Sequence, residues 1–293
     1  MSKEDKIMNT LNILIIFLLL IVTISGVCSF DKNHTYEIVN QYGENIMIWG
    51  AGVYAHDSLF KAPIFIGSDF TMLLFIVPLY IVTFWKLQKK NNIENYIQCF
   101  GILSLILYYS ASLALGVTYN YLHLIYIILF GMSFYGVVLL FTKLHTISIL
   151  QDKKYKYEIT KGTSLFLVIS GISLFIAWMP DIVSSLIKGT SLELIEVYTT
   201  EITYVLDIGI ISPLMFISLY LVKQKKFIGY VLLRMILRVC MGVGIMLPIQ
   251  TVFQLFSGIS IPIPAIITKV LIFVMLALFA VFFEHKMKEN DLI

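Results

Sequence analysis

The feature that most constrains this chain is a repeated run of about twenty apolar residues, each separated from the next by a short polar segment. A helix of that length spans the roughly 30 Å hydrocarbon core of a bilayer, because each residue adds about 1.5 Å. Of the 293 residues, 59% are hydrophobic and 13% are charged. A soluble domain of this size needs more polar residues to wet its surface. We therefore expect an all-α fold, a polytopic integral membrane bundle.

The apolar runs predict eight transmembrane helices in a single transmembrane domain over residues 1–293. The predicted ranges are 8–30, 69–85, 96–117, 121–142, 164–187, 202–222, 227–256 and 264–283. The first run exceeds the usual apolar region of a secretory signal, which favours an uncleaved first helix. The outer loop 31–68 contains an apolar stretch around Trp49 and Tyr54 that is too short to span, so we expect an interfacial segment there.

The distribution of basic residues predicts the orientation. With eight helices, both termini lie on one side of the membrane. That side carries fifteen lysines, and the opposite side carries Lys32, Lys61 and Lys188. Basic residues are enriched in cytoplasmic loops, so both termini are expected to be cytoplasmic.

Charged residues fall inside the predicted helices and are candidates for a functional site, because charges at bilayer depth are costly. Asp207 lies about 9 Å below Glu201 on the helical rise. Arg238 lies about 18 Å above Lys226, which places it roughly 12 Å below the outer surface. The depths match within one turn, so we expect an Asp207–Arg238 ion pair. Its role is equally open between fixing the helix register and serving a substrate or proton pathway.

The same region holds more positive than negative charge. Arg234 shares a helix face with Arg238, and we favour a structural role with a partly snorkelling side chain. Lys269 lies roughly 8 Å deep and either snorkels outward or joins Asp207. An anionic ligand or rim carboxylates would balance these cations, and the rim candidates are Asp69 and Asp181.

Other chemistry has little support in the sequence. Asn120 is the remaining site candidate, and a turn or N-cap role is favoured over ligand contact. Three cysteines without CxxC or Cys/His spacing predict neither zinc nor a disulfide framework. No GxSxG, HExxH or P-loop motif is present, which argues mildly against an enzyme. We expect no cofactor and no nucleic-acid partner, the lipid bilayer being the surroundings that the composition predicts.

A series of short motifs runs along most of the chain. They are Gly67-Ser68-Asp69 with Pro78, Tyr109, Asn120 to Tyr126, Trp178 to Asp181, Tyr204 to Gly209 with Pro213, and Gly229-Tyr230. In this order they resemble a group of bacterial multi-pass membrane proteins with no assigned function. The resemblance implies the eight-helix fold, the bacterial plasma membrane, an acidic residue at position 207 and a basic one at 238. It implies no activity.

The function expected from these observations is transport or binding of a small, possibly anionic solute at an outward-facing polar site. Two alternatives stay open. One is a membrane-embedded enzyme with an outward pocket, which would need a nucleophile or an acid–base set. The other is a sensor, immunity or assembly-partner protein, which would co-purify with its partner.

Overall fold

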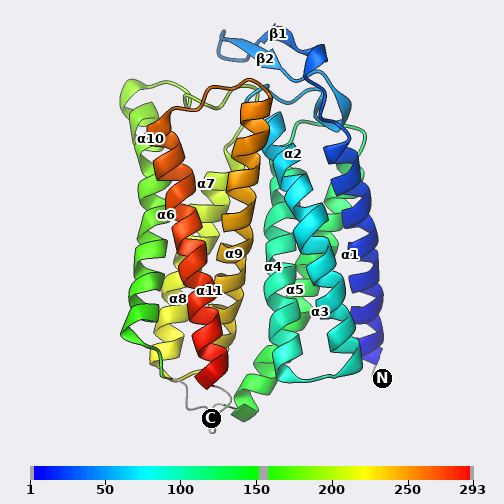
Figure 1. The fold of residues 1–293 in the computed structure, drawn as a ribbon, viewed down its shortest axis with the longest axis vertical. Helices are drawn as coiled ribbons and strands as arrows, with labels where there is room; N and C mark the ends of the chain where they lie inside the picture. Colours follow the sequence, from blue (N-terminus) through cyan, green and yellow to red (C-terminus); the bar gives the residue numbers. More distant parts are fainter. Residues whose placement is uncertain (1–2, 152–157, 291–293) are drawn as a thin grey trace.

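The computed structural model describes residues 3–151 and 158–290. Across these residues the fold is an all-α bundle of long antiparallel helices (Figure 1). The helices are α1 (Lys3–Val27), α2 (Ala62–Thr71), η3 (Met72–Ile76), α3 (Val77–Lys89), α4 (Ile93–Gly116), α5 (His123–Gln151), α6 (Lys161–Lys188), α7 (Ile202–Leu206), η4 (Asp207–Ile211), α8 (Ser212–Lys223), α9 (Phe227–Phe256), α10 (Ile263–Ile266), η5 (Ile267–Leu271) and α11 (Ile272–Asn290).

Several of these elements join end to end into continuous helical stretches. Seven stretches of the described chain are long and apolar enough to cross a membrane. The last stretch, Ile263–Asn290, was predicted as an eighth span, and that count stays a prediction. The all-α class and the apolar, membrane-type helices are confirmed.

Two of the stretches are interrupted by a wide helical turn just before a proline. The π-helical turn η3 precedes Pro78, and η4 precedes Pro213. Proline lacks a backbone N–H, and its ring clashes with the carbonyl four residues earlier. A π-turn widens the helix at this point, so the chain passes the proline without ending the helix.

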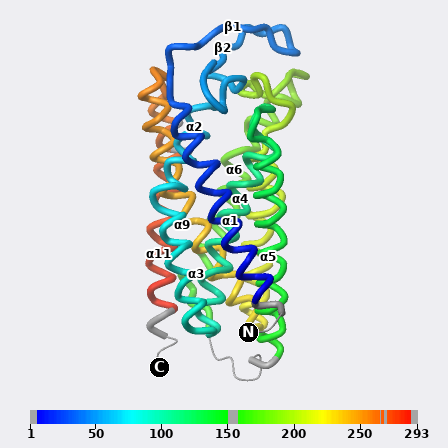
Figure 2. The backbone as a smooth tube through the Cα atoms, turned by 90° about the vertical axis from the view of Figure 1, so that its right-hand side faces the viewer, coloured from blue at the N-terminus to red at the C-terminus, as the bar shows by residue number. Residues whose placement is uncertain are grey.

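The start of α1 and the end of α11 lie at one end of the bundle, and a small cap covers the other end (Figures 1 and 2). The cap contains η1 (Lys32–His34), strand β1 (Tyr36–Val39), strand β2 (Asn45–Ile48) and η2 (Gly52–Tyr54). The strands pair antiparallel, with Tyr36 opposite Ile48.

The apolar stretch of the outer loop belongs to the cap, and its predicted interfacial position stays a prediction. Trp49 and Tyr54 are both fully buried in protein. The Trp49 indole N–H donates to the carbonyl of Ser29 at 2.9 Å, and the Tyr54 hydroxyl donates to Asp69 at 2.6 Å. The short apolar stretch therefore packs into the protein and closes this end of the bundle.

Three predicted helix boundaries were wrong in ways that matter for the site. The second stretch begins at Ala62 and not at residue 69. Helix α4 begins at Ile93 because the Asn92 side chain caps it, accepting from the backbone N–H of Asn95 at 2.9 Å. Helix α11 continues past residue 283 to Asn290, since no glycine or proline follows to end it. Glu94 and Glu284 therefore belong to helices and not to loops.

Helices α4 and α9 form the buried centre of the bundle. They pack against each other, and α2 crosses α9 closely at Gly67. A Cβ atom at Gly67 would lie 2.7 Å from the Cα of Gln250, so only glycine allows this approach. The Gln250 amide donates to the Ser68 hydroxyl at 2.7 Å beside this crossing.

Candidate functional site

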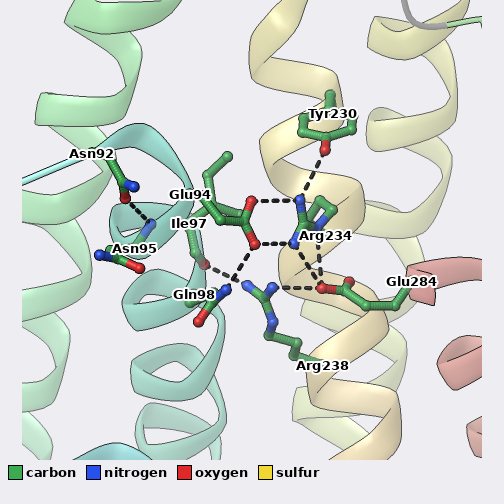
Figure 3. Close-up of polar contacts among 9 residues, drawn as sticks. All are labelled: Asn92, Glu94, Asn95, Ile97, Gln98, Tyr230, Arg234, Arg238 and Glu284. Carbon is green, nitrogen blue, oxygen red and sulfur yellow. Dashed lines mark hydrogen bonds and ion pairs between the residues drawn. The ribbon is translucent and has the colours of Figure 1, made fainter. Parts of the chain in front are cut away.

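The charged residues inside the bundle form separate centres, and the first lies near the end where the termini are, which we call the inner end; the cap marks the outer end. Its core is Arg234, which is fully buried. The guanidinium donates to both carboxylate oxygens of Glu94, at 2.9 and 2.6 Å, and to one oxygen of Glu284 at 3.1 and 2.8 Å (Figure 3). It also donates to the Tyr230 hydroxyl at 2.8 Å. A bidentate guanidinium–carboxylate pair of this kind is among the strongest polar contacts in proteins.

Arg238 completes this inner cluster. It donates to Glu284 at 2.5 Å and to the backbone carbonyl of Ile97 at 2.7 Å (Figure 3). Two arginines thus meet two glutamates, and the cluster is neutral overall. Because Glu94 is on α4, both arginines are on α9 and Glu284 is on α11, the cluster ties three helices together.

The predicted Asp207–Arg238 pair is wrong. Arg238 contacts the backbone carbonyl of Ile97 on α4, whereas Asp207 contacts Tyr108 of the same helix. These positions are eleven residues apart, or about 16 Å along the helix axis. Side chains lean toward the N-terminus of their own helix. Helix α9 begins at the inner end, so Arg238 leans inward, while Asp207 follows α7 and leans outward.

The sequence reasoning missed Glu94 and Glu284, which it left in polar segments flanking the helices. Two signals were available. Asn92 is a favourable N-cap, which brings Glu94 into the first helical turn. Residues 284–290 contain no helix breaker, which keeps Glu284 on the α11 face. With these glutamates in place, the excess positive charge inferred for the two arginines does not exist.

The second centre surrounds Asp207 in the outer half of the bundle. This carboxylate is 7% exposed. The Tyr108 hydroxyl donates to one of its oxygens at 2.9 Å, and the Trp178 indole N–H donates to the other at 2.9 Å. Among the described residues no cation pairs with it. Asp207 is therefore held by neutral donors alone.

A small cavity of about 40 Å³ lies beside this carboxylate, and we call it the Asp207 pocket. Its polar lining includes Tyr108, Asp207, Cys240 and Ser170, and its walls are aliphatic and aromatic side chains of α6, α8, α9 and α11. The Ser170 hydroxyl is buried and has no hydrogen-bond partner. Its oxygen and the Asp207 carboxylate thus supply polar atoms in an otherwise apolar space.

The other predicted site residues are placed as follows. Asp181 accepts from the Tyr204 hydroxyl at 2.8 Å. The Tyr204 ring stacks on Trp178, which donates to Asp207, so Asp181 is linked to Asp207 through these two aromatic side chains. Asn120 accepts from the backbone N–H of Leu122 at 2.9 Å, which is the turn role expected for it. Lys269 belongs to η5, and its side chain lies outside the described part of the structure.

Asp69 forms a third polar position, on the other side of α4. It is fully buried and accepts from the Tyr54 hydroxyl at 2.6 Å and from the Tyr109 hydroxyl. Gly26 of α1 packs directly against this carboxylate, since a Cβ there would lie 1.5 Å from the Oδ2 atom of Asp69. No ion pair to Asp69 occurs within the described residues.

The outer cap contains a buried carboxylate that sequence reasoning did not single out. Asp57 is fully buried and accepts from the backbone N–H and the hydroxyl of Thr118 at 3.0 and 2.9 Å, and from the Tyr198 hydroxyl at 2.9 Å. Burial raises the pKa of Asp57 to about 7, and the hydrogen bonds from Thr118 and Tyr198 only partly offset that effect. Beside it, Lys61 pairs with Glu201 and lies 4.2 Å from the centre of the Tyr198 ring.

The raised pKa of Asp57 predicts that stability depends on pH. The folded state binds this proton up to a pH of about 7, while the unfolded carboxyl releases it near its model value of 3.8. Folding is therefore favoured at acid pH, and this contribution is lost as the pH rises from about 4 to about 7. Burial also raises the pKa of Glu196, which acts in the same direction. The unfolding temperature of wild type should fall over this range more steeply than that of Asp57→Asn. Equal slopes would contradict the assignment to Asp57.

No protein-family model, curated protein or solved structure matches the chain. The function must therefore be inferred from the polar centres themselves.

Proposed function

We propose that the protein is a multi-pass transporter that binds a small solute at the Asp207 pocket. The observation that carries this proposal is a buried carboxylate that, within the described residues, accepts only from neutral donors, next to a cavity lined by Ser170, whose hydroxyl has no partner there. A buried charge without a counter-ion is costly. A bound group that is positively charged or donates hydrogen bonds relieves this cost.

Polar contacts between the two halves of the chain close both ends of the bundle, which supports the same proposal. The N-terminal half of the chain is α1 to α5, and the C-terminal half is α6 to α11. At the inner end, Glu94 of the first half binds Arg234 of the second. At the outer end, Lys61 pairs with Glu201, and Tyr198 donates to Asp57 across the halves. Hydrogen bonds and ion pairs that can break at either end fit a solute site that opens to one side of the membrane at a time.

The proposed solute differs in charge from the anionic one considered from the sequence. That expectation depended on the excess positive charge of Arg234, Arg238 and Lys269, and Glu94 and Glu284 neutralise the two arginines. The Asp207 pocket instead offers a carboxylate and a serine hydroxyl, which suit a small organic amine. Small organic acids serve as the contrasting class of solute in the binding experiment below.

The proposed location is the bacterial plasma membrane, with both termini cytoplasmic. Fifteen lysines on the side of the termini against three on the other support this orientation. Reporter fusions after Lys225 should therefore read cytoplasmic, and fusions after Asp57 and Glu196 should read external. A cytoplasmic signal after Asp57 would reverse or break the proposed topology.

The solute site is tested by thermal unfolding of purified protein with a panel of small organic amines and a matched panel of small organic acids. An amine should raise the unfolding temperature of wild type and of the exposed-carboxylate control Glu37→Gln, but not of Asp207→Asn. The same amine should then accumulate in vesicles that contain wild type. Stabilisation by acids, or stabilisation by amines that persists in Asp207→Asn, would contradict the proposal.

A further inference from the structure

The two halves of the chain repeat one arrangement of helices. In the N-terminal half α1 packs on the α2–η3–α3 stretch, α3 packs on α4, and α4 packs on α5. In the C-terminal half α6 packs on α8, α8 on α9, and α9 on α11. The halves stand side by side, with α4 and α9 at their junction (Figure 1). Each half is thus an up-and-down set of four helical stretches in the same packing order.

The second stretch of each half carries the same sequence of local features. Asp69 is followed by the π-turn η3, Pro78 and the basic end Lys86 to Lys90. Asp207 opens the π-turn η4, which is followed by Pro213 and the basic turn Lys223 to Lys226. Both stretches run from the cap end to the end where the termini lie. Parallel repeats of this kind occur in transporters, related by an axis along the membrane normal.

The two aspartates are also held in the same way. Asp69 receives hydroxyl hydrogens from Tyr54 and Tyr109. Asp207 receives hydrogens from Trp178 and Tyr108. Tyr108 and Tyr109 are successive residues of α4, so their side chains leave the helix about 100° apart at nearly the same depth. One central helix therefore supplies a tyrosine to a carboxylate on either side of it.

The donors around these carboxylates decide what each can bind. A metal ion needs several oxygen or other acceptor ligands. Each aspartate here faces hydrogen donors, and no group of three potential metal ligands occurs within residues 3–151 and 158–290. Asp69 has no solvent exposure, and Gly26 lies against it. A proton is the cation that fits this space.

The groups that face each carboxylate carry no positive charge within the described residues. Facing Asp69 are Tyr54 of the cap, Tyr109 of α4 and Tyr126 of α5. Facing Asp207 are Tyr108 of α4, Trp178 of α6 and Cys240 of α9. Glu201, at the start of α7, is the acidic residue that precedes Asp207 in the chain, and it is paired with Lys61. Lys269 of η5 has its side chain outside the described part.

We propose that Asp69 and Asp207 are counterpart proton-binding sites, one in each half of a four-plus-four repeat, and that the proton is the ion coupled to solute movement. The coupling of the proton to solute movement rests on the proposed transport function. The binding of two protons does not, because it follows from the burial of the two carboxylates and from the lack of a paired cation among the described residues.

Infrared spectroscopy of the purified full-length protein at pH 5 tests the proposal with the proton itself as the probe. A protonated carboxyl gives a carbonyl band, and an ionised one gives a carboxylate band. Subtracting the Asp69→Asn spectrum from that of wild type should leave one carbonyl band. Subtracting the Asp207→Asn spectrum from that of wild type should leave a second band at a different frequency. The exposed control Glu37→Gln should leave both carbonyl bands unchanged.

A second pair of variants keeps the test decisive if an asparagine variant does not fold. Tyr109→Phe should shift the carbonyl band of Asp69 alone, and Tyr108→Phe should shift that of Asp207 alone. Loss of a carboxylate band from either asparagine variant would overturn the proposal, as would tyrosine variants that move neither carbonyl band. Failure of the amine panel would reject the proposed solute and leave these bands in place, so the two failures are distinguishable.

Discussion

Replacing Arg234 with methionine should lower the free energy of unfolding by about 3–5 kcal/mol, because the change removes the buried cation that Glu94 and Glu284 share and leaves Glu284 with Arg238. Arg234 is fully buried and holds both Glu94 and Glu284. Arg234→Lys should also be costly, since lysine cannot donate to both oxygens of Glu94 in the forked geometry of arginine. Unfolding in mixed detergent micelles measures both losses.

The matched control is Lys225→Met, which removes a cation from an exposed pair with Glu158. Those two side chains are 67% and 77% exposed, so the loss should be at most about 1 kcal/mol. The double variant Arg234→Met with Glu94→Gln should lose less than the sum of the single losses, since the charge left alone is removed. A loss at Arg234 no larger than at Lys225 would show that the inner cluster is not buried as described.

Removing the Asp69 carboxylate should have the second largest effect. Asp69→Ala leaves the hydroxyls of Tyr54 and Tyr109 buried without an acceptor, and each costs about 1–3 kcal/mol. Adding Tyr54→Phe and Tyr109→Phe to Asp69→Ala should recover part of this loss, because no donor is then left unpaired. The exposed control Glu37→Ala should change stability by less than about 0.5 kcal/mol. A triple variant less stable than Asp69→Ala would contradict the role given to the two hydroxyls.

The general fold was predictable because it depends on the simplest property of the sequence. Apolar runs of bilayer length require helices, and short polar turns require antiparallel neighbours. The positions of Asp207 and Arg234 inside the bundle followed from counting residues along these runs. The helix ends were less accurate, and the error was consequential at Glu94 and Glu284, which lie two residues before and one residue after the predicted helices.

The partners of the buried charges could not be predicted from depth alone. Depth places Cα atoms, whereas a long side chain reaches several ångströms toward the N-terminus of its own helix. For antiparallel helices this moves the charges of Asp207 and Arg238 in opposite directions. The cap was hidden for a different reason. Residues 31–61 contain only a short apolar stretch between polar residues, and tertiary contacts with Thr118 and Tyr198 bury Asp57.

The central claim is that the inner ionic cluster and the Asp207 pocket are separate, which leaves Asp207 available to a solute or a proton. Two double-mutant cycles of unfolding free energy test it most directly. The cycle of Arg238→Met with Glu284→Gln should give an interaction energy of about 0.5–3 kcal/mol, because the two side chains are in contact at 2.5 Å. The cycle of Arg238→Met with Asp207→Asn should be additive within about 0.5 kcal/mol. Coupling between Arg238 and Asp207, with additivity between Arg238 and Glu284, would contradict the account.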